Sequence, residues 1–213
     1  MSDNKIAESQ GRALFNEYIS ENFDDNNLLS RFDRLTELYN EVNSVINISA
    51  IRNIDDIYVK HYLDSVYAAK YFSGKCCDVG CGGGFPCLPL AIVTGLRFDG
   101  IESVGKKLTL IRRAAAENIV NVTPVHARAE EAAKAGTLYE TVSARAVAEI
   151  DKVISFCAPL TAPNGKIVLY KTQNDSPASE KILLKYRLKL EKTENYNLPG
   201  TDIKRRLFIY RKE

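Results

Sequence analysis

The chain has 213 residues, of which 45% are hydrophobic and 26% are charged, and its formal net charge is +2. This balance is typical of a globular protein and excludes the collagen-like and disordered classes. The length predicts one α/β core with an appended element. No apolar run approaches the roughly 18 residues that a membrane span needs, so we expect a soluble protein.

Charge is distributed unevenly along the chain. Residues 1–30 carry two basic and six acidic side chains, whereas residues 181–213 carry ten basic and four acidic ones. The basic excess in the last segment is compatible with contact to a polyanion and equally with a solvated face.

Helical periodicity dominates the first third of the chain. Apolar side chains recur at helical spacing over 5–23 and 27–43, and the polar break between the two runs supplies N-cap residues for the second helix. Asp55 and Asp56 begin a third predicted helix, which ends near Gly74. We expect residues 1–73 to form an N-terminal helical extension and residues 74–213 to form a single compact core.

From Lys75 onward, short apolar runs alternate with helical segments, which is the pattern of βαβ units around a parallel sheet. Strands are predicted at 75–79, 97–102, 121–125, 138–144 and 165–171, with helices at 86–94, 105–118, 127–135 and 149–159. A polar loop around Pro177 then leads to two alternating runs, 186–194 and 204–211, which predict an antiparallel hairpin. The expected fold is α/β and Rossmann-like, with a mostly parallel seven-stranded sheet, helices on both faces and a reversed C-terminal pair of strands. Methyltransferases of this fold end their sheet in such a pair.

Five cysteines, an odd number, occur in a chain whose polar, acidic N-terminus does not resemble a secretory signal. They are expected to be free thiols in a reducing cytoplasm. Cys76 and Cys77 should alternate across a buried strand, while Cys81 and Cys87 fall in a loop. Because these positions do not converge as paired ligands, we predict no metal site.

A glycine cluster lies between the first predicted core strand and the helix after it, in the run Asp78-Val79-Gly80-Cys81-Gly82-Gly83-Gly84-Phe85-Pro86. Glycine permits the sharp turn and lets a ligand approach the backbone closely. The dinucleotide pattern would require a third glycine where this chain has Phe85, which argues against a pyrophosphate site. Asp78 is well placed to organise the loop and to meet the amino-acid end of a zwitterionic cofactor.

Glu102 ends the second core strand, 22 positions beyond Gly80. This is close to the spacing of about 20 expected for a carboxylate that binds ribose hydroxyls. Together, the loop and the carboxylate favour S-adenosylmethionine as the cofactor, whereas the loop alone would also fit a turn that only packs helix against strand.

Further short motifs lie at 47–51, 60–65, 78–90, 102–107, 128–131 and 143–146. In combination they resemble the motifs of one family, the small-subunit (16S) ribosomal RNA guanine-N7 methyltransferases, also called glucose-inhibited division protein B. The sequence departs from the family pattern at Cys87, where glycine is usual, at Ala144, which widens a Ser-Arg pair, and at Glu102, which replaces a common Asp. The first two departures affect the expected loop shape and cofactor affinity.

The resemblance implies a set of cofactor contacts. Gly80, Gly82 and Phe85 should line the cofactor pocket, and Glu102 should meet the ribose. Ala129 and Glu130 should flank the adenine. Arg145 should close the site and is the one candidate for a catalytic role, its alternative being a surface ion pair. The spacing of His61 and Asp64 places both on one helical face, where a structural contact between extension and core is expected.

The resemblance also implies methyl transfer to N7 of a guanine in 16S ribosomal RNA, as naked RNA or within the small subunit. We expect the protein to be a monomer. N7 carries a free lone pair, so we expect alignment rather than a general base or a cysteine nucleophile. Arg145 is then better suited to a phosphate or cofactor contact than to the reacting ring. Cations expected to contact the RNA backbone are Lys106, Lys107, Arg112, Arg113, Lys171, Lys204, Arg205 and Arg206. The alternatives are methylation of another acceptor and a non-catalytic nucleotide-binding module.

Overall fold

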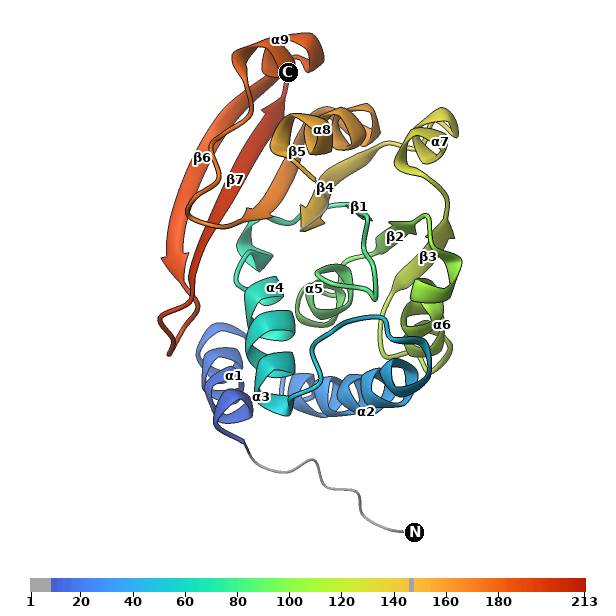
Figure 1. Ribbon diagram of the computed structural model, residues 1–213, viewed down its shortest axis with the longest axis vertical. Coiled ribbons are helices and arrows are strands. Elements are labelled where there is room, and N and C mark those ends of the chain that lie inside the picture. The colour runs from blue at the N-terminus through green and yellow to red at the C-terminus, as the bar shows by residue number, and fades with distance from the viewer. Residues whose placement is uncertain (1–8, 146–147) are drawn as a thin grey trace.

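A seven-stranded sheet forms the centre of the computed structural model, which describes residues 9–145 and 148–213 (Figure 1). The strand order is β3-β2-β1-β4-β5-β7-β6, parallel from β3 to β5, with β7 antiparallel to both of its neighbours. The bounds are β1 Cys76–Val79, β2 Phe98–Glu102, β3 Val122–His126, β4 Tyr139–Arg145, β5 Thr161–Lys171, β6 Leu188–Asn197 and β7 Lys204–Lys212. The predicted fold class is confirmed, including the reversed hairpin.

Two hydrophobic clusters cover the two faces of the sheet, because neighbouring residues on each strand point to opposite sides. Cys76 belongs to one cluster and Cys77 to the other, as the alternation predicted. The first face is covered by α1 Gln10–Asn22, α2 Leu28–Ile46, α5 Cys87–Thr94 and α6 Thr109–Ala116. The second is covered by α7 Ala129–Lys134, α8 Ile150–Cys157 and α9 Glu180–Tyr186 (Figure 1).

The N-terminal helices share their hydrophobic core with the sheet. Phe15 of α1 and Phe32 of α2 pack edge-on at 4.7 Å between ring centroids, and both lie in the cluster that contains Phe98 of β2. Arg31 of α2 donates hydrogen bonds from Nη2 to the Ile119 carbonyl at 2.6 Å and from Nη1 to the Ile92 carbonyl at 3.2 Å. The guanidinium therefore ties α2 to the last turn of α5 and to the connection between α6 and β3.

The segment that follows α2 differs from the single helix predicted to end near Gly74. It consists of α3 Ile54–Asp56, a π-helix η1 Ile57–Leu63, α4 Asp64–Val66 and a 3₁₀ turn η2 Ala69–Tyr71. In η1 the backbone widens, so that the Asp64 N–H bonds to the carbonyl of Val59, five residues earlier. Hydrophobic spacing does not distinguish these helical types here, because each segment is only three to seven residues long and so spans at most about two turns.

Other boundaries also differ from the prediction. The helix expected over 5–23 is described as α1 Gln10–Asn22, and residues 5–8 lie outside the described residues. Within the segment expected to be loop and strand, α9 begins after Ser179, whose hydroxyl accepts the Ile182 N–H, and ends at Tyr186. No residue of α9 is buried, so its sequence lacks the strong apolar periodicity from which a helix is predicted. Strand β5 begins at Thr161, earlier than residue 165.

No helix in the described ranges combines the length and the apolar character needed to cross a membrane.

The first prediction concerns Arg31. Replacing it with alanine leaves two backbone carbonyls without their charged donor, so the free energy of unfolding should fall by about 2 kcal/mol. Urea denaturation followed by circular dichroism measures this change. Arg97→Ala is the control, since Arg97 is exposed, and it should stay within about 0.5 kcal/mol of wild type. Equal effects of the two substitutions would show that the Arg31 bonds do not hold α2.

Candidate functional site

The glycine loop connects β1 to α5 along a path that requires positive φ. Gly80, Gly82 and Gly84 have φ angles of +68°, +56° and +101°. A Cβ on Gly84 would lie 2.4 Å from Cδ1 of Leu88, so the loop packs tightly on α5 at that point. A Cβ on Gly82 would meet no atom within 4 Å. The loop therefore has an open side at Gly82, as a bound ligand requires.

Glu102 lies beside this loop at the carboxyl end of β2. Its Oε2 accepts the Gly82 N–H at 3.1 Å, and its Oε1 accepts the Val104 N–H at 2.8 Å. The side chain is 7% exposed, and its two oxygens are therefore held in a defined orientation. The structure thus brings together the two features that the sequence analysis combined.

Asp78 organises the loop from beneath, as predicted. Its Oδ2 accepts the Cys87 N–H at the start of α5 (3.3 Å), and its Oδ1 accepts the Ser143 hydroxyl of β4 (2.9 Å). The carboxyl is fully buried, and this burial raises its pKa to about 7, although the hydrogen bond from Ser143 and the charge of Arg145 act in the opposite direction. Contact between Asp78 and the amino-acid end of a cofactor stays a prediction.

The predicted adenine contacts lie at the next strand end. Glu102 pairs with His126 in the β2–β3 register, and α7 begins soon after β3 with Ala129 and Glu130. Ala129 packs partly against the second hydrophobic cluster, while Glu130 is exposed. Their position beside Glu102 is compatible with the predicted role, which stays a prediction.

Arg145 ends β4 and reaches into the N-terminal helices. Its Nη1 donates to Oδ2 of Asp64 and to the carbonyl of Lys60, both at 3.2 Å, and its Nη2 lies 3.3 Å from Nδ1 of His61. The ion pair with Asp64 is mostly buried: the Asp64 side chain is 6% exposed, and the Arg145 side chain, which also lines the pocket, is 14% exposed. Arg145 therefore forms an ion pair that is internal rather than at the surface. His61 and Asp64 hold the extension to the core, as expected.

His61 is neutral in this arrangement. Burial, together with the charge of Arg145, lowers its pKa to about 3. Because a guanidinium has only donors, Nδ1 must accept from Arg145, and the proton on Nε2 is then donated to the Ser49 hydroxyl at 3.0 Å. The imidazole stacks on Phe85 with a centroid distance of 4.1 Å and an interplanar angle of 7°. Phe85 is 7% exposed, so this stack fixes the end of the glycine loop.

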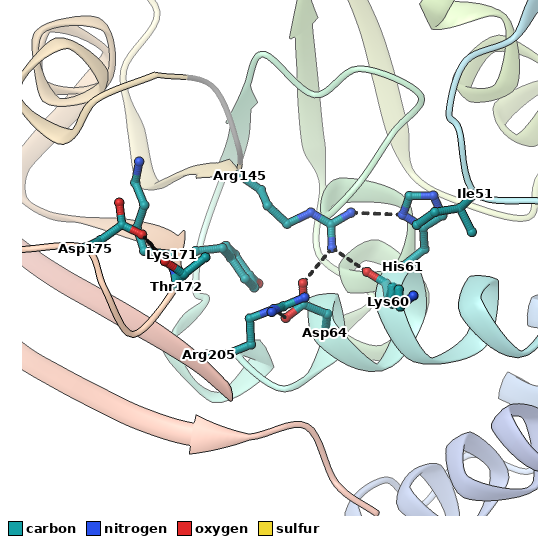
Figure 2. Close-up of a pocket in the computed structure, with 10 residues that line it drawn as sticks. Ile51, Lys60, His61, Asp64, Arg145, Lys171, Thr172, Asp175 and Arg205 are labelled. Carbon is teal, nitrogen blue, oxygen red and sulfur yellow. Dashed lines mark hydrogen bonds and ion pairs between the residues drawn. The ribbon is translucent and has the colours of Figure 1, made fainter. Parts of the chain in front are cut away.

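A pocket of about 530 Å³ opens beside Arg145, at the carboxyl ends of β4 and β5 (Figure 2). Four cationic and two anionic side chains contribute to its wall. The lining residues are Ile51, Lys60, His61, Asp64, Arg145, Tyr170, Lys171, Thr172, Asp175 and Arg205. Parallel α/β sheets bind ligands at the carboxyl ends of their strands, and the volume is suitable for a nucleotide-sized group.

The sequence analysis identified only part of this pocket. It singled out His61, Asp64, Arg145, Lys171 and Arg205 but missed Thr172 and Asp175, which lie in the segment read as a polar loop. Their position directly after strand β5 was a usable signal, because loops at that edge of the sheet carry function.

The basic residues predicted to contact RNA lie in different environments. Lys171 and Arg205 line the pocket. Arg113 pairs with Glu41 at 2.6 Å, and Arg112 donates to the Gly105 carbonyl at 3.0 Å. The cations far from the pocket are therefore engaged partly in surface contacts, and their RNA contacts stay predictions.

All five cysteines are buried. Burial raises the pKa of the Cys77, Cys87 and Cys157 thiols, which disfavours the thiolate that a cysteine nucleophile needs. The Cys87 side chain, where the family pattern has glycine, is accommodated inside the first hydrophobic cluster. Among the residues that the structure describes, no group of three or more His, Cys, Asp or Glu could hold a metal ion.

Two solved structures share the fold of this chain. Magnesium protoporphyrin IX methyltransferase from Synechocystis PCC 6803 with bound SAH superimposes with a TM-score of 0.57 at 18% identity, covering 96% of this chain and 100% of that chain. TehB from Haemophilus influenzae gives a TM-score of 0.52 at 18% identity, covering 83% and 67%. The sheet order, with the glycine loop after β1 and the carboxylate at the end of β2, is therefore the Rossmann-like fold found in class I methyltransferases.

Sequence comparison identifies the family within this class. The family model for rRNA small subunit methyltransferase G matches residues 28–209. The ribosomal RNA small subunit methyltransferase G of Lysinibacillus sphaericus is 32% identical over 196 residues, covering 86% of this chain and 82% of that protein. Its counterpart in Bacillus subtilis is 31% identical over 196 residues, with the same two coverages. The chain belongs to the rRNA small subunit methyltransferase G family, and the resemblance inferred from the motifs is confirmed.

The second prediction uses the two buried titratable groups, which act on stability in opposite directions. The unfolded chain protonates His61 near its usual pKa of 6.5, whereas the folded protein does so only near 3, so this group lowers stability as pH falls below 6.5. Folded Asp78 takes up its proton near pH 7, whereas unfolded Asp78 does so only near pH 3.8. This group therefore raises the free energy of unfolding as pH falls from 7 toward 3.8.

His61→Gln should therefore remove an acid-destabilising contribution. The difference in unfolding free energy between wild type and variant should shrink as pH falls from 6.5 to 4.5, by up to about 1.4 kcal/mol per pH unit. Asp78→Asn should change the pH slope in the opposite direction. Urea denaturation at each pH gives both slopes, and parallel pH curves for wild type and His61→Gln would contradict the neutral imidazole.

Proposed function

We propose that this protein transfers a methyl group from S-adenosylmethionine to N7 of a guanine in 16S ribosomal RNA, in the cytoplasm and as a monomer. The observation that carries the proposal is the nucleotide-sized cationic pocket joined to the glycine loop through Arg145, His61 and Phe85, in a chain of this family. The names of the relatives are the basis for ribosomal RNA as the substrate.

The residues around the loop fit the cofactor. The open side at Gly82 and the positive φ at Gly80 give the backbone room to lie against it, and Glu102 offers acidic oxygens for ribose hydroxyls. Phe85 bounds the loop, and Ala129 with Glu130 lies at the next strand end, where an adenine would extend. When bound, the cofactor supplies an electrophilic methyl group on a sulfonium.

The pocket is suited to align the acceptor base with the methyl group. A guanine N7 has a lone pair in the plane of the ring, so no proton has to be removed before it attacks the methyl group. The protein has to hold the guanine in line with the methyl group and to exclude other bases from the pocket. Lys171, whose Nζ also donates to the Ala148 carbonyl at 2.7 Å, and Arg205, which pairs with Asp64, line the pocket and are the candidates for phosphate contacts beside the base. Arg145 has donors committed to Asp64, Lys60 and His61, which favours a positioning role for it over direct action on the ring.

Binding of the cofactor provides the third prediction. Glu102→Ala should weaken S-adenosylmethionine binding by about 10- to 100-fold in calorimetric titration, because the ribose loses a charged acceptor. Glu180→Ala, an exposed substitution at the start of α9, should leave the affinity unchanged. Equal affinities for wild type and Glu102→Ala would place the ribose elsewhere.

The fourth prediction tests the reaction. Tritiated methyl groups should be transferred to small ribosomal subunits that lack the modification, and nucleoside analysis should recover the label as 7-methylguanosine. Gly80→Trp should abolish this transfer because the indole fills the cleft beside the loop. Label in another nucleoside would indicate a different acceptor, and cofactor binding without transfer to RNA or subunits would favour a non-catalytic or differently targeted protein.

A further inference from the structure

The pocket contains a carboxylate of which only one oxygen is held by hydrogen bonds. Asp175 follows β5 in a turn closed by the hydrogen bond from its N–H to the Thr172 carbonyl at 3.1 Å. Its Oδ2 accepts both the N–H and the hydroxyl of Thr172, at 2.8 Å and 2.7 Å. Its Oδ1 receives no hydrogen bond from any residue in the described ranges 9–145 and 148–213. One oxygen is therefore anchored and the other is available to a ligand.

This carboxylate is ionised at neutral pH. Burial alone would raise its pKa, but the hydrogen bonds from Thr172 and the charges of Lys171 and Arg206 hold the pKa below its ordinary value. Asp64, the other acid in the pocket, is already occupied: Arg145 lies on one oxygen, and Arg205 and Tyr196 lie on the other. Asp175 is thus the acidic group in the pocket wall with free capacity to accept hydrogen bonds.

A carboxylate in a base-sized pocket distinguishes the nucleobases by their donor edges. Guanine presents N1–H and the exocyclic N2 amine side by side, whereas adenine and cytosine present an unprotonated ring nitrogen that a carboxylate repels. Uracil has a single ring N–H between two carbonyl acceptors. An ionised acceptor therefore fits guanine better than any of the other three bases.

The arrangement of the pocket matches this orientation. Figure 2 shows Asp175 with Lys171 and Thr172 on one side, His61 on the opposite side and Arg145 between them. The N2 amine and N7 lie at opposite ends of the purine. A guanine bound to Asp175 through its amine would direct N7 toward the side of the pocket where His61 stacks on Phe85 at the end of the glycine loop.

We propose that Asp175 is the specificity-determining residue of the acceptor pocket, with Oδ1 accepting hydrogen bonds from N1–H and the N2 amine of the target guanine, and that Thr172 positions it. This inference rests on the proposed function, because it assigns a role to the pocket in which the methyl acceptor is bound. It applies to a guanine turned out of its RNA stack into the pocket.

The fifth prediction compares two acceptors that differ in one group. The wild-type reaction is first used to locate the modified guanine in 16S ribosomal RNA. Small subunits are then reconstituted with RNA that carries either guanine or inosine at that position. Inosine keeps N7 and N1–H but lacks the N2 amine. Single-turnover transfer by wild type should be about 10-fold slower on inosine. Asp175→Asn and Asp175→Ala should be slower than wild type on guanine and should discriminate less than about 3-fold between the two acceptors.

Controls separate this role from a structural one. Asp202→Asn, an exposed acid in the β6–β7 turn, should keep the wild-type discrimination. The Asp175 variants should bind S-adenosylmethionine with wild-type affinity, since Asp175 contacts none of the loop residues. A variant slowed by the same factor on both acceptors, or inactive on both, would overturn the inference, as would wild-type transfer that is equally fast on both. Absence of 7-methylguanosine with wild type would instead overturn the proposed function itself.

Discussion

A guanidinium at the carboxyl end of β4 joins the two halves of the candidate site. Arg145 contacts Asp64, Lys60 and His61 on the N-terminal helices, and its guanidinium carbon lies 5.9 Å from the centre of the Phe85 ring. A buried ion pair contributes little net stability, because removing two charges from water costs nearly as much as their attraction returns. The effect of Arg145 is therefore mainly positional: it sets the extension at a fixed place relative to the glycine loop.

This position depends on a neutral imidazole. A protonated His61 would place a second cation 3.3 Å from Nη2 of Arg145 and would lose the acceptor on Nδ1. Burial prevents protonation, and the widened turn of η1 brings the Lys60 carbonyl and the His61 ring to the same guanidinium. Tyr196 of β6 and Tyr170 of β5 hold the following turn, through Asp64 Oδ1 at 3.3 Å and the Ser65 carbonyl at 2.8 Å. The pocket wall is thus assembled from the extension, the parallel strands and the hairpin.

The sequence predicted those parts of the site that depend on local patterns. Gly80 and Glu102 could be located because a tight βα turn and a strand-end carboxylate have characteristic spacings. The pairing of His61 and Asp64 followed from helical periodicity, but their common partner, Arg145, lies more than 80 residues away, and no periodicity reports such a contact. Asp175 was missed for a related reason. Its role comes from a turn closed by Thr172 and from a pocket that exists only after the extension docks.

The distribution of positive charge explains why recognition of the RNA should depend on this pocket. Of the basic C-terminal segment, Arg205 pairs with Asp64, Arg211 pairs with Glu191, and Lys212 donates to the carbonyls of Ala158 and Thr161. Part of the excess charge noted in the sequence therefore holds β6 to β7 and joins the hairpin to the N-terminal helices and to the start of β5, an outcome that neither a solvated face nor a polyanion contact describes. A protein that bound RNA through a continuous row of free cations would show steep salt dependence and little preference among sequences. Here the cations in the pocket accompany Asp175, one oxygen of which has no hydrogen-bond donor among the described residues. A carboxylate repels phosphate, so its presence fits a site that distinguishes one base from the others.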